Sequence, residues 1–205
     1  MVAAPSHLRG FSLLELAVVL VIISLLSAGA ITALHVQTER KQQAEAQTLL
    51  TEARESLISY AVINGVLPCP DHDADGNPDA CGKTGVEHGG LPWKLLALPA
   101  KDPWGQTLHY AVHTNFATGK TISLNTTSNL EIQSKDASGT ISSLADEASV
   151  VMALWSTGPN TNDNSRGSTD SKLIAESPTS DDTVIWLSRF VMIGRMLEAG
   201  RDIAQ

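Results

Sequence analysis

A long apolar segment near the N-terminus, preceded by a single carboxylate, constrains what this chain can fold into. Residues 16–34 hold no charged side chain, and this length is close to the roughly 20 apolar residues that a membrane-spanning helix needs. Glu15 stands directly before that stretch, and an ionised side chain at membrane depth costs at least about 2.5 kcal/mol. No Lys, Arg or His follows Glu15 within two helical turns. The sequence therefore predicts a membrane-spanning helix in which the position of Glu15 needs an explanation.

The residues around Glu15 form a recognisable motif. Arg9-Gly10-Phe11-Ser12-Leu13-Leu14-Glu15 resembles the N-terminal signature of type IV pilins and of the pseudopilins of type II secretion systems. The resemblance implies that prepilin peptidase cleaves after Gly10 and methylates the new amine, that of Phe11. It also implies that Glu15 pairs with the terminal amine of a neighbouring subunit, which offsets the cost of burying both charges. An ordinary signal peptide or anchor with a chance glutamate is the other interpretation.

The same resemblance implies a location and partners. Residues 1–10 would be a leader peptide, and residues 11–34 a single inner-membrane helix that also forms the polymerisation core. The remaining chain would be a periplasmic domain. The implied partners are other pilin or pseudopilin subunits, the prepilin peptidase and the inner-membrane assembly platform. The formal charge of −8 disfavours nucleic acid as a major partner of the globular part.

Residues 35–63 change from a uniformly apolar to an amphipathic pattern. Apolar side chains recur at steps of three and four residues: Ala46, Leu49, Leu50, Ala53, Leu57, Tyr60 and Ala61. This spacing places them on one face of a helix, and Asn64-Gly65 followed by Pro68 supplies a stop signal. We therefore expect one long helix over residues 11–63, with its second half packed beneath a globular domain at residues 64–205.

Within the globular domain, residues 64–105 are rich in Gly, Pro and Asp and predict a long loop. Residues 106–205 form the β-sheet region, with strands expected at 107–112, 120–125, 130–133, 150–156 and 183–187. Residues 157–182 are almost entirely polar and predict a surface loop, and residues 190–199 predict a short closing helix. The fold class is therefore α+β: a long N-terminal helix packed on a small antiparallel sheet, as the resemblance to pilins also implies.

Two internal stretches extend the resemblance. Lys101-Asp102-Pro103-Trp104-Gly105-Gln106 is similar to the Asp-Pro-Trp-Gly turn of major pseudopilins, and Leu154-Trp155-Ser156-Thr157-Gly158 is similar to a later stretch of the same proteins. The first has its own physical logic, since proline sets a turn and glycine permits a positive φ.

The chain has two cysteines, Cys69 and Cys81. They lie in the domain that the resemblance places outside the cytoplasm, where a close pair most often forms a disulfide.

Aspartates alternate between these cysteines, around Gly76. They are Asp71, Asp73, Asp75 and Asp79. The pattern matches the first half of an EF-hand calcium loop, whose carboxylates converge on Ca²⁺. Position twelve of that loop would be Gly82 instead of glutamate. A structural calcium site and a solvated acidic turn held by the disulfide both remain open.

A competing calcium site follows from the resemblance alone. Major pseudopilins bind calcium in the loop before the last strand, which implies the following ligands here: Asn160, Asp163, Asp181 and Asp182. The chain departs from the family at this loop, because Gly158 is followed by Pro159-Asn160 instead of Ala-Asp.

No catalytic motif stands out in the sequence. It contains no His-Glu-x-x-His pattern, P-loop or nucleophile elbow. We therefore predict a structural subunit of a type II secretion pseudopilus or of a type IV pilus, with no enzymatic activity. The alternative from another class is a membrane-anchored periplasmic binding module or hydrolase that does not polymerise.

Overall fold

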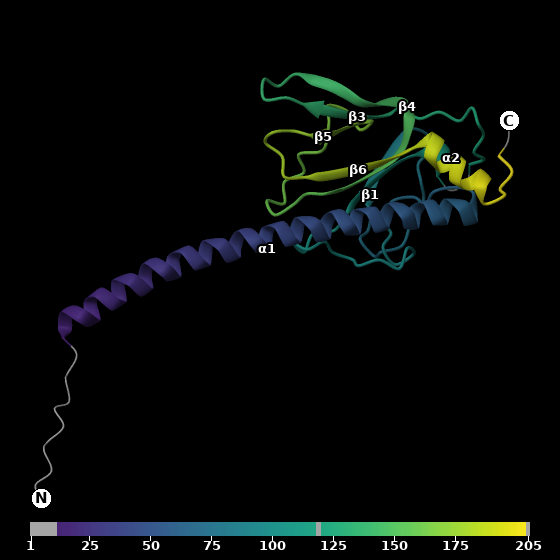
Figure 1. Cartoon of the computed structure of the whole chain (residues 1–205). Helices are drawn as coiled ribbons and strands as arrows, with labels where there is room; N and C mark the ends of the chain where they lie inside the picture. Colours follow the sequence, from purple (N-terminus) through teal and green to yellow (C-terminus); the bar gives the residue numbers. More distant parts are fainter. Residues whose placement is uncertain (1–11, 118–119, 204–205) are drawn as a thin grey trace, which may run out of the picture. The chain divides into compact units, whose positions relative to one another are not determined.

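The computed structural model describes residues 12–117 and 120–203, and for residues 27–35 it describes only the backbone. The chain divides into two compact units, residues 1–41 and residues 42–205, which we treat separately. Figure 1 shows the elements in chain order. The leader expected at residues 1–10 lies outside the described residues.

Helix α1 runs from Leu13 to Asn64, which confirms the long N-terminal helix. Of the predicted apolar stripe, six residues are at most 8% exposed and Tyr60 is half-buried; the six are Ala46, Leu49, Leu50, Ala53, Leu57 and Ala61. The helix ends as predicted, because Gly65 has a φ of +81° and donates its N–H to the carbonyl of Ala61 at 2.8 Å. This is the left-handed conformation that glycine adopts after a helix.

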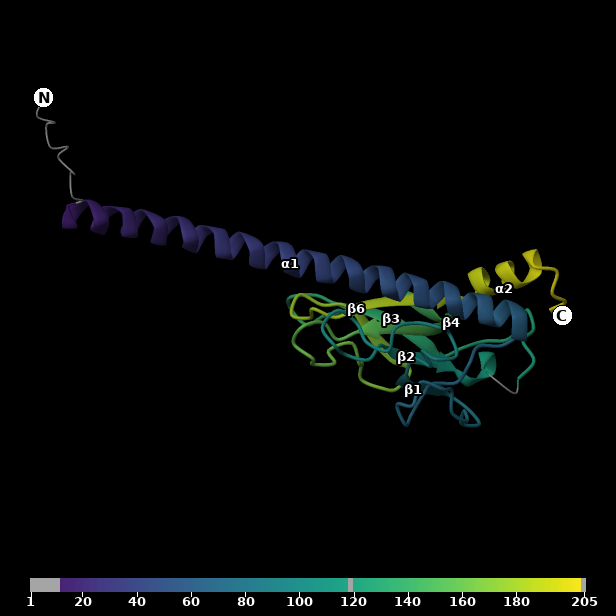
Figure 2. The same cartoon turned by 90° about the horizontal axis from the view of Figure 1, so that it is seen from below.

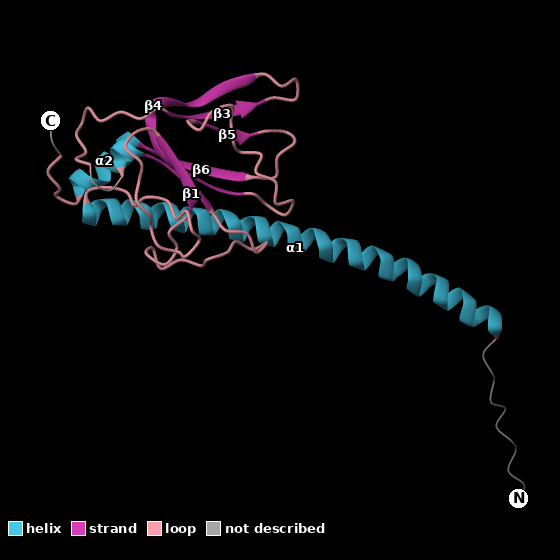
Figure 3. Cartoon of the chain, turned by 180° about the vertical axis from the view of Figure 1, so that it is seen from behind, coloured by secondary structure: helices cyan, strands magenta, loops and turns pink. Residues whose placement is uncertain are grey.

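The second unit contains a six-stranded sheet and a short helix (Figure 3). Its strands are β1 (Val86–Gly90), β2 (His109–His113), β3 (Leu130–Lys135), β4 (Ile141–Ser156), β5 (Lys172–Glu176) and β6 (Thr183–Ser188). A 3-10 turn, η1 (Thr114–Phe116), follows β2, and α2 (Arg189–Glu198) follows β6. The strand order is β1-β2-β4-β3-β5, and β6 also pairs with β4.

The expected α+β class is confirmed, but the sheet is mixed instead of antiparallel, because β5 pairs with β3 in parallel. The cause lies in the path of the chain. Strands β3 and β4 are antiparallel, so the end of β4 returns to the beginning of β3, where Leu130 faces Val150. The polar segment after β4 stays at this end of the sheet, and the Glu131 N–H bonds the carbonyl of Ser171 just before β5 begins. Strand β5 therefore starts beside the start of β3 and runs in the same direction.

Two strands lie in segments predicted as loops, and one predicted strand is absent. Strand β1 lies within the expected loop 64–105, and β5 lies within the expected loop 157–182. Residues 120–125 form no strand, because the chain turns there with a hydrogen bond from the Thr126 N–H to the Ser123 carbonyl at 3.1 Å. Strand β1 has no apolar alternation, and its conformation comes from pairing with the edge of β2.

The part of α1 from residue 42 onward lies along one face of the sheet, together with α2 (Figure 2). Side chains on β2 alternate between two buried clusters. Tyr110 and Val112 pack with Leu57 of α1, while Ala111 joins Leu130 in the cluster on the opposite face. This period of two is what a strand covered on both faces requires. The core therefore depends on one stripe of α1 meeting one face of β2 and β4.

We expect Leu57→Ala to lower the free energy of unfolding by about 2–5 kcal/mol, because it leaves a cavity at a fully buried position. Ile63→Ala is the matched control on the same helix, since Ile63 is 73% exposed; its cost should stay within about 0.5 kcal/mol. Chemical unfolding of the detergent-solubilised chain would measure both. Equal costs for the two variants would contradict this packing of α1.

Candidate functional site

The described part of the N-terminal motif lies in the first turn of α1. The Ser12 Oγ accepts a hydrogen bond from the Leu14 N–H at 3.3 Å, as an N-cap residue does. Glu15 follows three residues later, where the partial positive charge of a helix N-terminus favours a carboxylate. Gly10 and Phe11, the predicted cleavage pair, lie outside the described residues.

The apolar side chains that follow this motif are exposed in the first unit taken by itself. Every Leu, Val and Ile from Leu13 to Leu26 is at least 47% exposed. Such a continuous apolar surface marks an interaction with protein or lipid. In the stretches that the structure describes, no helix has the length and apolar character needed to cross a membrane.

A second candidate site lies in the loop between Cys69 and Cys81. The structure contains the predicted disulfide, with the two Cα atoms 5.4 Å apart. Asp71 and Gly90 exchange backbone hydrogen bonds at 3.0 and 2.7 Å, and the Asp79 N–H donates to the carbonyl of Pro70 at 3.1 Å. The loop is therefore attached to β1 and closed on itself.

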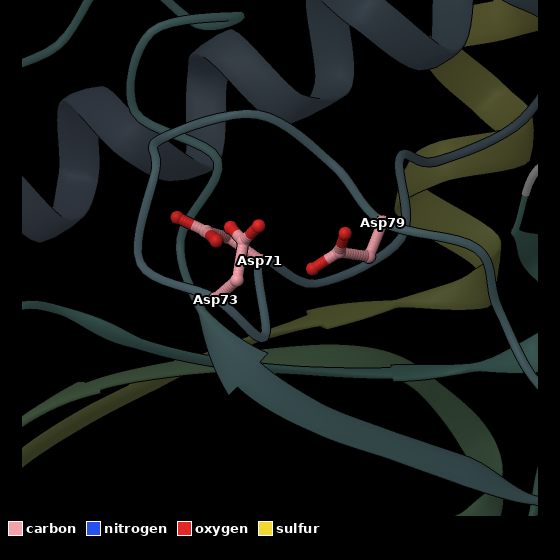
Figure 4. Close-up of side chains that lie close together, drawn as sticks. All are labelled: Asp71, Asp73 and Asp79. Carbon is pink, nitrogen blue, oxygen red and sulfur yellow. The ribbon is translucent and has the colours of Figure 1, made fainter.

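Three of the four predicted aspartates converge inside this loop. Asp71, Asp73 and Asp79 each offer one carboxylate oxygen, and these oxygens lie within 4.8 Å of one another (Figure 4). Asp75 is not part of the group, and both of its oxygens accept hydrogen bonds from Asn77. Those bonds lower the pKa of Asp75. The alternating aspartates in the sequence identified the loop, but they did not predict that Asp75 would lie outside the cluster.

The competing set in the later loop does not gather in this way. Asp163 accepts hydrogen bonds from the Trp155 indole and from Arg166, and Asp181 accepts them from Asn160. Among the residues with described side chains, these carboxylates form no group of three that could share a metal ion.

Asp182, the fourth member of that set, accepts hydrogen bonds from the Asn164 N–H and the Ser165 hydroxyl at 2.9 and 2.7 Å. Burial raises its pKa, and the charges of Asp163 and Asp181 add to the rise. Its other oxygen, Oδ1, is buried without a hydrogen-bond partner, but the described side chains around it supply no group of three metal ligands.

The two internal stretches that resemble major pseudopilins contact each other through Asp102. Its Oδ1 accepts hydrogen bonds from the N–H groups of Trp104 and Gln106 at 3.0 and 2.8 Å. Its Oδ2 accepts one from the Ser156 hydroxyl at 2.6 Å, and the Gly158 N–H donates to that hydroxyl at 3.2 Å. Asp102 and Ser156 are both buried. Sequence reasoning identified both stretches and missed their contact, since nothing in the spacing links them.

Two of the histidines are explained by packing around Trp155. The His109 ring stacks on Trp155 with centroids 5.1 Å apart, and His88 meets it edge-on at 6.0 Å. Burial lowers the pKa of both histidines, so the neutral ring is favoured. Trp155 is fully buried.

We expect Ser156→Ala to destabilise the chain by about 1.5–3 kcal/mol, because it removes a hydrogen bond to the buried Asp102 carboxylate. Ser59→Ala removes an exposed hydroxyl that bonds only within α1, and it should change stability by less than about 0.5 kcal/mol. Urea unfolding of both variants provides the measurement. A cost for Ser156→Ala no larger than that of Ser59→Ala would refute the role of this junction.

Comparison with known protein families identifies one region. Residues 6–31 match the family model of the prokaryotic N-terminal methylation motif, a span that includes Gly10, Phe11 and Glu15 and continues into α1. No curated protein and no solved structure matches the chain. The chain therefore carries the N-terminal methylation motif that is the signature of type IV pilins and pseudopilins.

Proposed function

We propose that this chain is a structural subunit of a type II secretion pseudopilus or of a type IV pilus. The observation that carries the proposal is the methylation motif at residues 6–31, which leads directly into α1. Prepilin peptidase would cleave between Gly10 and Phe11 and methylate the amine of Phe11. The function is then assembly and requires no catalysis.

The exposed apolar surface of α1 supports this assignment. The described side chains from Leu13 to Leu26 have no cover in their own unit, and burying one Leu, Val or Ile is worth about 1.5–3 kcal/mol. Lipid would cover this surface in the precursor, and the equivalent helices of neighbouring subunits would cover it in the filament. Transfer between these environments needs no refolding of the second unit.

Glu15 would align the subunits during that transfer. Glu15 follows Phe11 by four residues in the sequence, and the resemblance to pilins implies that its carboxylate pairs with the Phe11 amine of a neighbouring subunit. An unpaired carboxylate in an apolar filament core is strongly destabilising, whereas a paired one is tolerated. The charge pair would therefore mainly fix the position of each subunit along its neighbours in the filament.

The proposed location is the inner membrane, with a single pass over residues 11–34 and the second unit in the periplasm. The uncharged sequence of residues 16–34 supports the membrane segment. The Cys69–Cys81 disulfide supports an oxidising compartment for the second unit. The partners would be other pilin-type subunits, the prepilin peptidase and the assembly platform.

A membrane-anchored periplasmic binding module or hydrolase is the second candidate. It would share the anchor and the disulfide but would have no need of a cleavage motif or of Glu15. Processing by the prepilin peptidase therefore separates the two functions.

We expect cells that contain prepilin peptidase to yield a chain that begins at N-methylated Phe11. Cells that lack the peptidase should yield the uncut chain. Intact-mass spectrometry of the membrane fraction under non-reducing conditions tests this, and it also reports the disulfide as a loss of about two hydrogens. An identical uncut mass in both strains would support the anchored module instead.

Glu15→Ala should leave insertion and cleavage intact and reduce the amount of chain in sheared filaments at least about tenfold, because one buried charge loses its partner. Ser12→Ala is the matched control, since it removes a hydrogen bond in the same helical turn and no charge. Immunoblots of the filament and membrane fractions would quantify both. Normal incorporation of Glu15→Ala would exclude the pairing role.

A further inference from the structure

We propose that the loop between Cys69 and Cys81 binds one Ca²⁺ ion through the carboxylates of Asp71, Asp73 and Asp79. Calcium binding in this loop would be independent of filament assembly. Three observations support it: a buried oxygen that lacks a partner, the spacing of the three carboxylates, and the attachment of the loop.

Asp71 supplies the observation that an ordinary acidic turn does not explain. The residue is only 2% exposed. Its Oδ2 accepts a hydrogen bond from the Gly76 N–H at 2.7 Å, while its Oδ1 is buried and has no hydrogen-bond partner in the described structure. Buried polar atoms are almost always paired, because loss of hydration is otherwise uncompensated. A cation bound beside Oδ1 would provide the missing interaction.

The surrounding charge favours a cation. Residues 69–90 contain five acidic side chains and one lysine. Among the residues with described side chains, the only basic group within ion-pair distance of the three carboxylates is His72, whose Nδ1 lies 3.6 Å from Asp79 Oδ2. His72 also approaches Glu87 at 3.7 Å and is 42% exposed, so it contributes little to neutralising Asp71 or Asp73.

The spacing of the oxygens fits calcium, and the ligand chemistry favours it over other ions. Oxygens bound to one Ca²⁺ at roughly 2.3–2.6 Å can be at most about 4.6–5.2 Å apart. The three ligand oxygens, within 4.8 Å of one another, fit that sphere. Mg²⁺ binds at roughly 2.0–2.1 Å, demands a near-ideal octahedron and keeps several of its waters, so it is rarely held by a protein cage of carboxylates alone. Zn²⁺ prefers nitrogen and sulfur ligands, and the cysteines are in the disulfide. Water and backbone carbonyls would complete the calcium shell.

The loop is held in the shape that binding needs. The disulfide closes it, and Asp71 is attached to β1 through Gly90 on both backbone groups. Gly76 lies at the bend with a φ of +86°, and a Cβ there would stand 2.5 Å from the Trp93 ring. A larger residue would therefore displace the bend from Trp93. Because these contacts order the loop in advance, ion binding requires little further loss of conformational entropy.

The direct test uses the purified full-length chain in detergent after removal of metal by a chelator. Isothermal titration calorimetry with Ca²⁺, at constant ionic strength, should give one site per chain with a Kd in the range of about 0.1–1 mM, as in extracellular calcium modules. Free Ca²⁺ at ten times the Kd should raise the melting temperature by about 3–6 °C. Mg²⁺ at the same concentration should raise it by less than about 1 °C. The absence of a calcium shift, or an equal shift with Mg²⁺, would overturn the proposal.

Charge-matched variants within the loop locate the site. Asp73→Asn should weaken calcium binding at least about tenfold, whereas Asp75→Asn removes the same charge from outside the cluster and should change the Kd by less than about twofold. Both side chains are exposed, so both variants should fold. Asp71→Asn should abolish the calcium shift. Equal weakening by Asp73→Asn and Asp75→Asn would indicate a diffuse acidic surface and refute a built site.

Discussion

Burial of one apolar stripe of α1 against β2 and β4 holds the second unit together, and the other features of that unit depend on it. Ala46, Leu50, Ala53, Leu57 and Ala61 have no exposed surface. Because three of these five are alanines, the helix can approach the sheet closely, while the two leucines supply most of the buried area. The stripe thereby orients the sheet, whose opposite face buries Trp155 among smaller side chains.

Polar interactions then set the positions of the loops on this core. Asp102 joins the turn before β2 to the end of β4 through the Ser156 hydroxyl. Both oxygens of its carboxylate accept hydrogen bonds, from the N–H groups of Trp104 and Gln106 and from that hydroxyl. Asp71 is as deeply buried but leaves one oxygen without a partner. This difference supports a structural role for Asp102 and the proposed ligand role for Asp71.

The two units differ in how their apolar side chains are covered. In the second unit, apolar side chains are buried within the chain itself, so this unit has its own core. In the first, the described apolar side chains from Leu13 onward remain exposed, and a surface of this kind is usually covered by lipid or by another protein. In the proposed pilus subunit, this combination would let the chain move from the membrane to a filament while only the environment of its first unit changes.

The sequence by itself determined the features that depend on residues close together in the chain. The methylation motif, the end of α1, its buried stripe, the disulfide and the closing helix were all predictable, because periodicity and turn signals act locally. Only the tertiary structure decided the existence of β1 and β5, the parallel pairing of β5 with β3, the contact between Asp102 and Ser156, and the exclusion of Asp75 from the aspartate cluster. Each of these depends on a partner that is distant in sequence or on the path of a loop, and a strand such as β1 forms only because the edge of β2 offers backbone hydrogen bonds.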